Sequence, residues 1–219
     1  MLMGISSVSA METRGSHFFV TTMMGPCAPL GPKTFRQSMG ATLGYRIGML
    51  IRLYGKAHIG LNVAYQPVGY DHDFVRDSFM QNALPPSSIS NIRGGQIESS
   101  IVSVHIVQGI SINKKMDIYI RCGAGYYFQK TQTFKADILM AGYESEVEIK
   151  TDSKNRPGIQ GGLGVDLPLG YRYHLFVEGA VHFFMTQDFK LWYPETGLVE
   201  TIEGPVSMIH FLTGISIAL

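Results

Sequence analysis

Three charged residues lie in segments where apolar and small side chains alternate: Arg121, Asp166 and Glu178. A period of two directs each charged side chain away from the bulky apolar face of its segment. When residues are counted along each segment from its short connection, the three charged residues lie at nearly the same depth. An unpaired charge in a confined interior is costly, so the spacing predicts a network of ion pairs among them. Arg46 and Arg52, from an earlier segment, are further candidates to join the network across the interior.

A serine and a histidine, Ser103 and His105, share one face of another alternating segment. An imidazole beside a hydroxyl can activate the serine as a nucleophile. Two residues along a strand span roughly 7 Å, however, which is long for a direct hydrogen bond between them. Val102 and Val104 occupy the opposite, apolar face. We therefore predict no catalytic residues.

Four histidines share the small and polar face of their segments: His58, His105, His182 and His210. Their levels along the segments differ, and no Cys/His spacing typical of a zinc site accompanies them. We expect histidines that are hydrogen-bonded in the interior. His72 lies between two aspartates, but an isolated Asp-His-Asp is a weak metal-binding pattern. The sequence predicts neither a metal site nor a cofactor.

The segments that carry these residues have the alternation of β-strands. From Leu43 to Leu53, every second residue is bulky and apolar, and the residues between them include Gly44, Arg46 and Gly48. A polar face exposed to water should be crowded with charged residues, whereas small residues and isolated charges suit a narrow interior. The apolar face must then meet lipid, as in membrane barrels that are apolar outside and polar inside.

Eight such strands can be recognised from alternation and turn residues. They span roughly residues 16–25, 40–54, 57–66, 100–112, 117–128, 158–169, 174–185 and 207–219. Short connections at 55–56, 113–116 and 170–173 alternate with long ones at 28–38, 67–99, 129–157 and 186–206. The predicted fold is all-β: an eight-stranded antiparallel up-and-down transmembrane β-barrel with short periplasmic turns and long extracellular loops. Alternation over 143–149 indicates a strand pair that projects beyond the membrane.

Aromatic residues gather near the strand ends, where amphipathic rings can form girdles at the two membrane interfaces. Ordinary β-propensity of aromatic residues is the alternative explanation. The predicted girdle comprises Tyr65, Tyr126, Phe128 and Phe183 on the loop side and Tyr54, Tyr171 and Tyr173 on the turn side.

Composition supports a membrane barrel and excludes a nucleic-acid-binding protein. Charged residues make up 16% of the 219 residues, against roughly 25% in an ordinary soluble domain. The net charge of +1 leaves no basic surface for nucleic acid. One barrel domain over residues 11–219 accounts for the chain, and Val8-Ser9-Ala10 resembles the end of an export signal over residues 1–10. A segment that simply leads into the first strand is the alternative for those residues.

The alternation over nearly the whole chain resembles that of the small eight-stranded outer-membrane β-barrels, typified by the OmpA transmembrane domain, OmpX and the PorT-like barrels. The final alternation Phe211, Thr213, Ile215, Ile217, Leu219 ends in leucine, where that class usually has an aromatic residue. The resemblance implies a location in the bacterial cell outer membrane, in contact with membrane lipid and lipopolysaccharide.

Three functions are open at this point. The first is a non-enzymatic barrel with a filled polar lumen, which displays loops for adhesion or for docking to a protein partner in an envelope complex. The second is a lipid-modifying enzyme of the deacylase or acyltransferase type. The deacylases of the wider class use a His-x-Ser arrangement, and this chain has the reverse order in Ser103 and His105. The third is a soluble lipocalin-like barrel with its apolar face inward.

Overall fold

The structure is a computed structural model, which describes residues 18–31, 36, 39–73, 76–77, 87–113, 115–140, 142–149, 155–193 and 198–219. The predicted export signal at 1–10 lies outside these residues. Within them, no helix has both the length and the apolar character to cross a bilayer.

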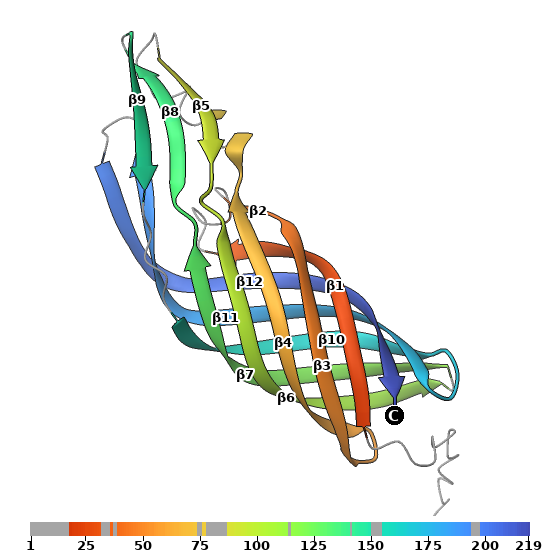
Figure 1. The fold of residues 1–219 in the computed structure, drawn as a ribbon. Helices are drawn as coiled ribbons and strands as arrows, with labels where there is room; N and C mark the ends of the chain where they lie inside the picture. Colours follow the sequence, from red (N-terminus) through yellow and green to blue (C-terminus); the bar gives the residue numbers. More distant parts are fainter. Residues whose placement is uncertain are drawn as a thin grey trace, which may run out of the picture.

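β-strands account for nearly all of the described chain (Figure 1). Their bounds are β1 Phe18–Gly31, β2 Met39–Gly40, β3 Thr42–Tyr54, β4 Ala57–Tyr70, β5 Ser87–Arg93, β6 Ile97–Asn113, β7 Met116–Thr131, β8 Phe134–Met140, β9 Tyr143–Ile149, β10 Asn155–Pro168, β11 Tyr173–Tyr193 and β12 Leu198–Ala218.

Eight of the described strands close a barrel in the order β1, β3, β4, β6, β7, β10, β11, β12. Every neighbouring pair is antiparallel, and the pairing of β1 with β12 completes the ring. The strands are tilted relative to the long axis, as barrel closure requires (Figure 1). This confirms the predicted all-β, eight-stranded barrel.

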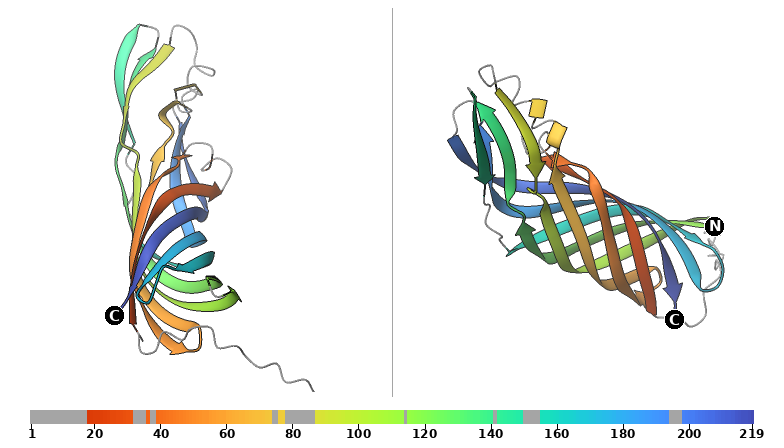
Figure 2. Two further views of the ribbon diagram at one scale, coloured as in Figure 1. Left: turned by 90° about the vertical axis from the view of Figure 1, so that its right-hand side faces the viewer. Right: turned by 45° about the horizontal axis from the view of Figure 1, so that its top comes forward.

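The two ends of the barrel differ. At one end, here called the turn end, β3–β4, β6–β7 and β10–β11 are joined by short connections. At the other, the loop end, β5, β8 and β9 form a separate three-stranded sheet. This sheet and the long β11–β12 hairpin project from the barrel as two separate extensions (Figure 2). The strand pair predicted around 143–149 is present as β8 and β9.

The predicted loop at 186–206 is wrong in part, because β11 continues to Tyr193 and β12 begins at Leu198. The two strands stay paired through this region after a register shift between Phe184 and Gln187. Phe189, Leu191 and Tyr193 alternate in the sequence, so the end of β11 carries a strand signal that the loop prediction missed.

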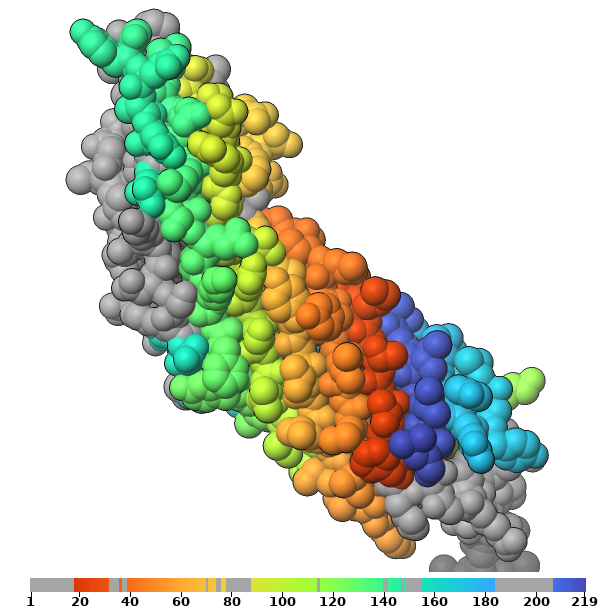
Figure 3. All heavy atoms as spheres, in the orientation of Figure 1, coloured from red at the N-terminus to blue at the C-terminus, as the bar shows by residue number. Residues whose placement is uncertain are grey.

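Bulky apolar side chains cover the outside of the barrel. Leu43, Ile47 and Val63 are 61%, 55% and 54% exposed, whereas Arg46 is 5% exposed on the opposite face of β3. In the space-filling view, the neighbouring strands β1, β3 and β4 form a continuous wall (Figure 3). Since water would not stabilise so large an exposed apolar surface, lipid is its natural solvent. This orientation excludes the soluble lipocalin-like barrel.

Candidate functional site in the barrel lumen

A buried carboxylate, Glu178 on β11, is the centre of the charged lumen. Arg46 reaches it from β3 with two hydrogen bonds, Nη1 to Oε1 at 2.8 Å and Nη2 to Oε2 at 2.9 Å. Arg121 reaches it from β7, with Nη2 at 2.6 Å from Oε1. The hydroxyl of Tyr119 donates to Oε2 at 2.9 Å. Three strands from different parts of the chain are thereby joined through one side chain.

The neighbouring strand β10 makes room for this cluster because it presents glycines at its level. Gly162 pairs with Arg121, and Gly164 pairs with Glu178. A Cβ atom on Gly164 would lie 2.4 Å from Cζ of Tyr119, and one on Gly162 would lie 3.1 Å from Oε1 of Glu178. The missing side chains thus provide the volume that Tyr119 and Glu178 occupy.

Two residues expected in the network lie elsewhere, so their inclusion was wrong. Asp166 contacts Nδ1 of His174 at 2.9 Å, closer to the turn end. In the β10–β11 register Asp166 is level with Phe176, two residues away from Glu178. Residue counts from each turn did not account for the stagger of tilted strands. Arg52 is six residues from Arg46 and donates through Nε to the carbonyl of Gly55 at 2.6 Å in the β3–β4 turn.

A second, uncharged layer surrounds Ser103. Its hydroxyl donates to Oδ1 of Asn62 at 2.5 Å and accepts from Nε2 of Gln160 at 2.6 Å. The amide nitrogen of Asn62 lies 3.2 Å from Nδ1 of His105. Ser103 and His105 therefore both contact Asn62, and the described hydrogen bonds do not join them directly. A serine 2% exposed inside the lumen is also poorly placed to meet a lipid substrate.

A third layer, towards the loop end, contains two buried histidines and a glutamine. The side-chain nitrogen of Gln66 lies 3.2 Å from Nε2 of His182 and 3.3 Å from Nδ1 of His210. The hydroxyl of Tyr127 lies 3.0 Å from Nδ1 of His182. These histidines have hydrogen-bonding partners, as the sequence pattern indicated. Among the described residues, no group of three His, Cys, Asp or Glu side chains could hold a metal ion.

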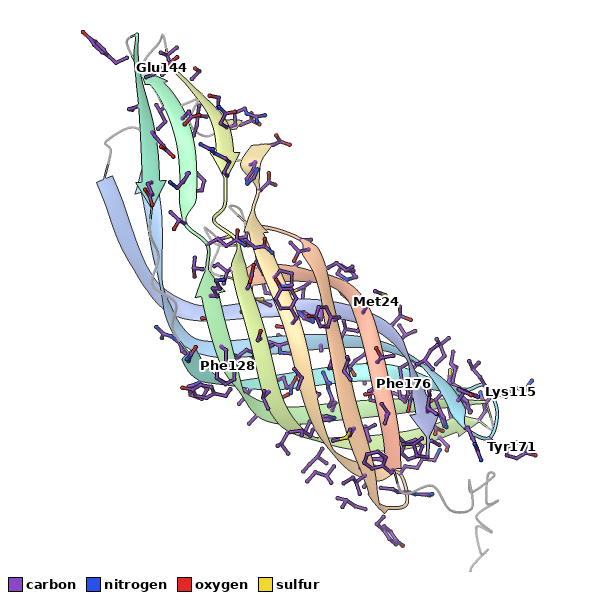
Figure 4. The ribbon with its side chains drawn as sticks, in the orientation of Figure 1. Met24, Lys115, Phe128, Glu144, Tyr171 and Phe176 are labelled. Atoms are coloured by element: carbon purple, nitrogen blue, oxygen red, sulfur yellow. The ribbon has the colours of Figure 1, made fainter. Side chains whose placement is uncertain are left out.

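Apolar and aromatic side chains cover the polar layers at both ends. Towards the loop end, Cys27, Val68, Ile101 and Met208 belong to one cluster of fully buried residues. Towards the turn end, the ring of Phe19 packs edge-on against His58 and His174, with ring centres 5.5 and 6.0 Å apart, and the ring of Tyr119 packs similarly against Phe176, labelled in Figure 4. Buried side chains therefore lie at each of these levels of the described lumen.

Five of the seven predicted girdle residues lie on the outward parity of a strand, whereas Tyr54 has the inward parity of Arg46 at the end of β3 and Tyr171 lies in the β10–β11 turn. Tyr126, Phe128 and Phe183 are exposed towards the loop end and Tyr65 is half-buried, while Tyr54, Tyr171 and Tyr173 are exposed at the turn end. Figure 4 shows Phe128 and Tyr171 on the outside at opposite ends. The ring of Tyr65 stacks on that of Tyr45 at 5.3 Å, so Tyr45 belongs to the same surface and was missed.

Sequence reasoning placed Asn62 on the polar face of its strand but missed Tyr119, Tyr127 and Gln66 as members of the lumen. Tyr119 and Tyr127 have the same parity on β7 as Arg121, and Asn62 and Gln66 share the parity of Gly60 and Ala64 on β4. That parity was a usable signal. Tyr126 and Phe128 on β7 were predicted for the girdle, whereas Tyr119 and Tyr127 were not predicted for the lumen.

No protein-family model matches the chain, and no curated protein matches its sequence. Solved structures do match. Neisserial surface protein A is 12% identical, with a TM-score of 0.51, and the match covers 93% of this chain and 98% of that chain. The outer membrane protein OprG from Pseudomonas aeruginosa is 9% identical, with a TM-score of 0.50, and the match covers 93% of this chain and 96% of that chain.

The closed barrel with its apolar exterior defines an integral β-barrel membrane protein. Its fold is that of the small eight-stranded outer-membrane barrels. Among the solved structures, it is similar to Neisserial surface protein A and to OprG. The fold and the exposed apolar belt together place the chain in the bacterial outer membrane, where lipid covers that belt.

Proposed function

We propose that this chain is a non-enzymatic outer-membrane barrel that displays an interaction surface at its loop end. The observation that carries this proposal is the division of the molecule into a filled lumen and a folded extension. Glu178, Arg121 and Ser103 in the lumen are each 2% exposed, and each contacts other side chains of the lumen. The lumen then serves to hold the scaffold rigid, and the outer strands serve recognition.

The extension is built to persist outside the membrane. Ile89, Ala136 and Ile138 are buried on one face of the β5–β8–β9 sheet. On the other face, Arg93 lies 3.8 Å from carboxylates of both Asp137 and Glu146. This organisation supports adhesion or docking to a protein partner in an envelope complex, with lipopolysaccharide and lipid around the belt. The girdle rings would then mark the two membrane interfaces.

Tag accessibility tests this orientation. An epitope inserted after Gly142, in the β8–β9 turn, should be labelled on intact cells by an impermeant antibody. An epitope inserted after Lys115, in the β6–β7 turn, should be labelled only after the outer membrane is permeabilised. Lys115 and Glu144 mark these two ends in Figure 4. Labelling of the Lys115 tag alone on intact cells would reverse the proposed topology and remove the display function.

Replacing the lumen serine separates a structural role from catalysis. Ser103→Ala should lower the free energy of unfolding by about 1–3 kcal/mol, because Asn62 and Gln160 lose a buried partner. Urea titration of the protein in lipid vesicles measures this loss. The lipid A and phospholipid profiles of cells should stay unchanged. A profile that differs between wild type and Ser103→Ala at equal barrel abundance would instead support the lipid-modifying enzyme.

A further inference from the structure

Among the described strands, β9 pairs on one side only. It pairs with β8 along its whole length, from Met140 opposite Tyr143 to Phe134 opposite Ile149. On its other side, β9 has no pairing with any described strand. The β11–β12 hairpin stands apart from this sheet in the left view of Figure 2. An open edge presents a row of backbone donors and acceptors to which another extended segment can add as a strand.

The charge beside this edge selects the kind of segment that can add. Glu144, Glu146 and Glu148 alternate along β9, so all three lie on one face of the sheet. Lys135 lies 3.5 Å from Glu146 and from Glu148, whereas Glu144 is exposed at the tip. Of the described side chains on this face, four are acidic and two are basic: Asp137, Glu144, Glu146, Glu148, Arg93 and Lys135.

A second copy of the chain fits this edge poorly. Two β9 strands paired edge to edge would place one row of three glutamates beside an identical row. Like charges on neighbouring strands destabilise a pair, so the edge rejects its own copy and other acidic strands. Lysine or arginine at alternate positions of an incoming strand would instead lie beside the glutamates and form attractive cross-strand pairs.

We propose that the open edge of β9 binds an extended basic segment of a partner protein as an added strand. This inference rests on the proposed display function, since the edge must face the outside of the cell. A polar groove of about 460 Å³ extends across the sheet from β5 over β8 to β9, where long basic side chains of a strand added beside β9 can reach it. Its polar lining comprises Ser88, Ser90, Asn91, Asp137, Glu144, Ser145 and Glu146.

Short synthetic peptides test the proposal on the full chain in detergent micelles or nanodiscs. The probe is a fluorescent peptide of alternating lysine and threonine. One control alternates glutamate and threonine. A second control is the basic peptide with alternate backbone nitrogens methylated, which keeps the charge but blocks one hydrogen-bonding edge. Fluorescence anisotropy measures affinity, and hydrogen exchange measures the protection of the β9 backbone amides.

The basic peptide should bind and protect the β9 amides, and both controls should bind about tenfold more weakly or not at all. Glu144→Lys should weaken binding of the basic peptide by about tenfold. The matched control Glu98→Lys makes the same charge change on β6, in the barrel wall, and should leave affinity unchanged. Because Glu144 is exposed at the tip, its replacement should not affect barrel folding.

Equal binding of the methylated and unmethylated basic peptides would overturn strand addition, since charge alone would then account for the contact. Absence of binding by the basic peptide would also overturn it. If the Gly142 tag is nevertheless labelled on intact cells, the display function stands and only the proposed partner chemistry fails. If the Gly142 tag is not labelled on intact cells, the display function is wrong, and the strand-addition proposal that rests on it is wrong as well.

Discussion

Glu178→Ala should destabilise the folded barrel by about 3–5 kcal/mol, because it leaves two guanidinium groups buried without their carboxylate. Arg46 and Arg121 are 5% and 2% exposed, and both contact Glu178. Removing one partner of a buried ion pair lowers the free energy of unfolding strongly, because the other charge stays buried and unpaired. Replacing the whole pair by apolar side chains has a much smaller effect. Urea unfolding in lipid vesicles, followed by the heat-dependent gel shift of folded barrels, measures the loss.

Glu98, which is half-buried, provides the matched control. Glu98→Ala should change the free energy of unfolding by less than about 1 kcal/mol. A second variant, Glu178→Ala with Arg46→Met, should recover part of the stability because one unpaired charge is removed. Equal stability of wild type and Glu178→Ala would mean that water or ions already screen the two arginines. The buried ion-pair cluster around Glu178 would then not stabilise the barrel as described.

Gly164→Ala should cost up to about 3 kcal/mol, because the added methyl group has no space. Its Cβ would lie 2.4 Å from Cζ of Tyr119 and 2.7 Å from the carbonyl oxygen of Val177. Gly161→Ala on the same strand is the matched control. Its nearest atom, the carbonyl oxygen of Arg121, is 4.0 Å away, so the expected change is within about 0.5 kcal/mol.

A double-mutant cycle assigns the Gly164 effect to the lumen. Tyr119→Ala should cost less in the Gly164→Ala background than alone, because the truncated ring no longer opposes the methyl group. Additive costs in equilibrium unfolding would place the strain at the Val177 backbone and not at Tyr119. Equal stability of the Gly164→Ala and Gly161→Ala variants would contradict the packing described for the lumen.

Period-two alternation was enough to predict the barrel, because a membrane imposes one apolar face on every strand. Leu43, Ile47 and Val63 lie outside for that reason. Outside the apolar belt this constraint ends, and there the prediction was incomplete. Within 186–206, β11 and β12 continue as a paired hairpin, which the prediction of a loop did not include.

Parity correctly indicates which side chains enter the lumen, but not which of them meet. Arg121 and Glu178 meet beside Gly162 and Gly164, with which they are in register, and Arg46 reaches Glu178 from β3. Asp166 has the same parity, yet the stagger of β10 against β11 places it beside His174. Register depends on turn geometry and on closure of the whole ring, and neither can be obtained by counting along one strand.

The barrel has one orientation, with apolar side chains towards lipid and polar side chains towards the lumen. Spin labels introduced singly along β4 from His58 to Gln66, in a background with Cys27→Ser and Cys122→Ser, test it directly. Their accessibility to oxygen dissolved in the bilayer should alternate with a period of two, with maxima at Ile59, Leu61, Val63 and Tyr65. Maxima at Asn62, Ala64 and Gln66, or no alternation, would contradict the described barrel.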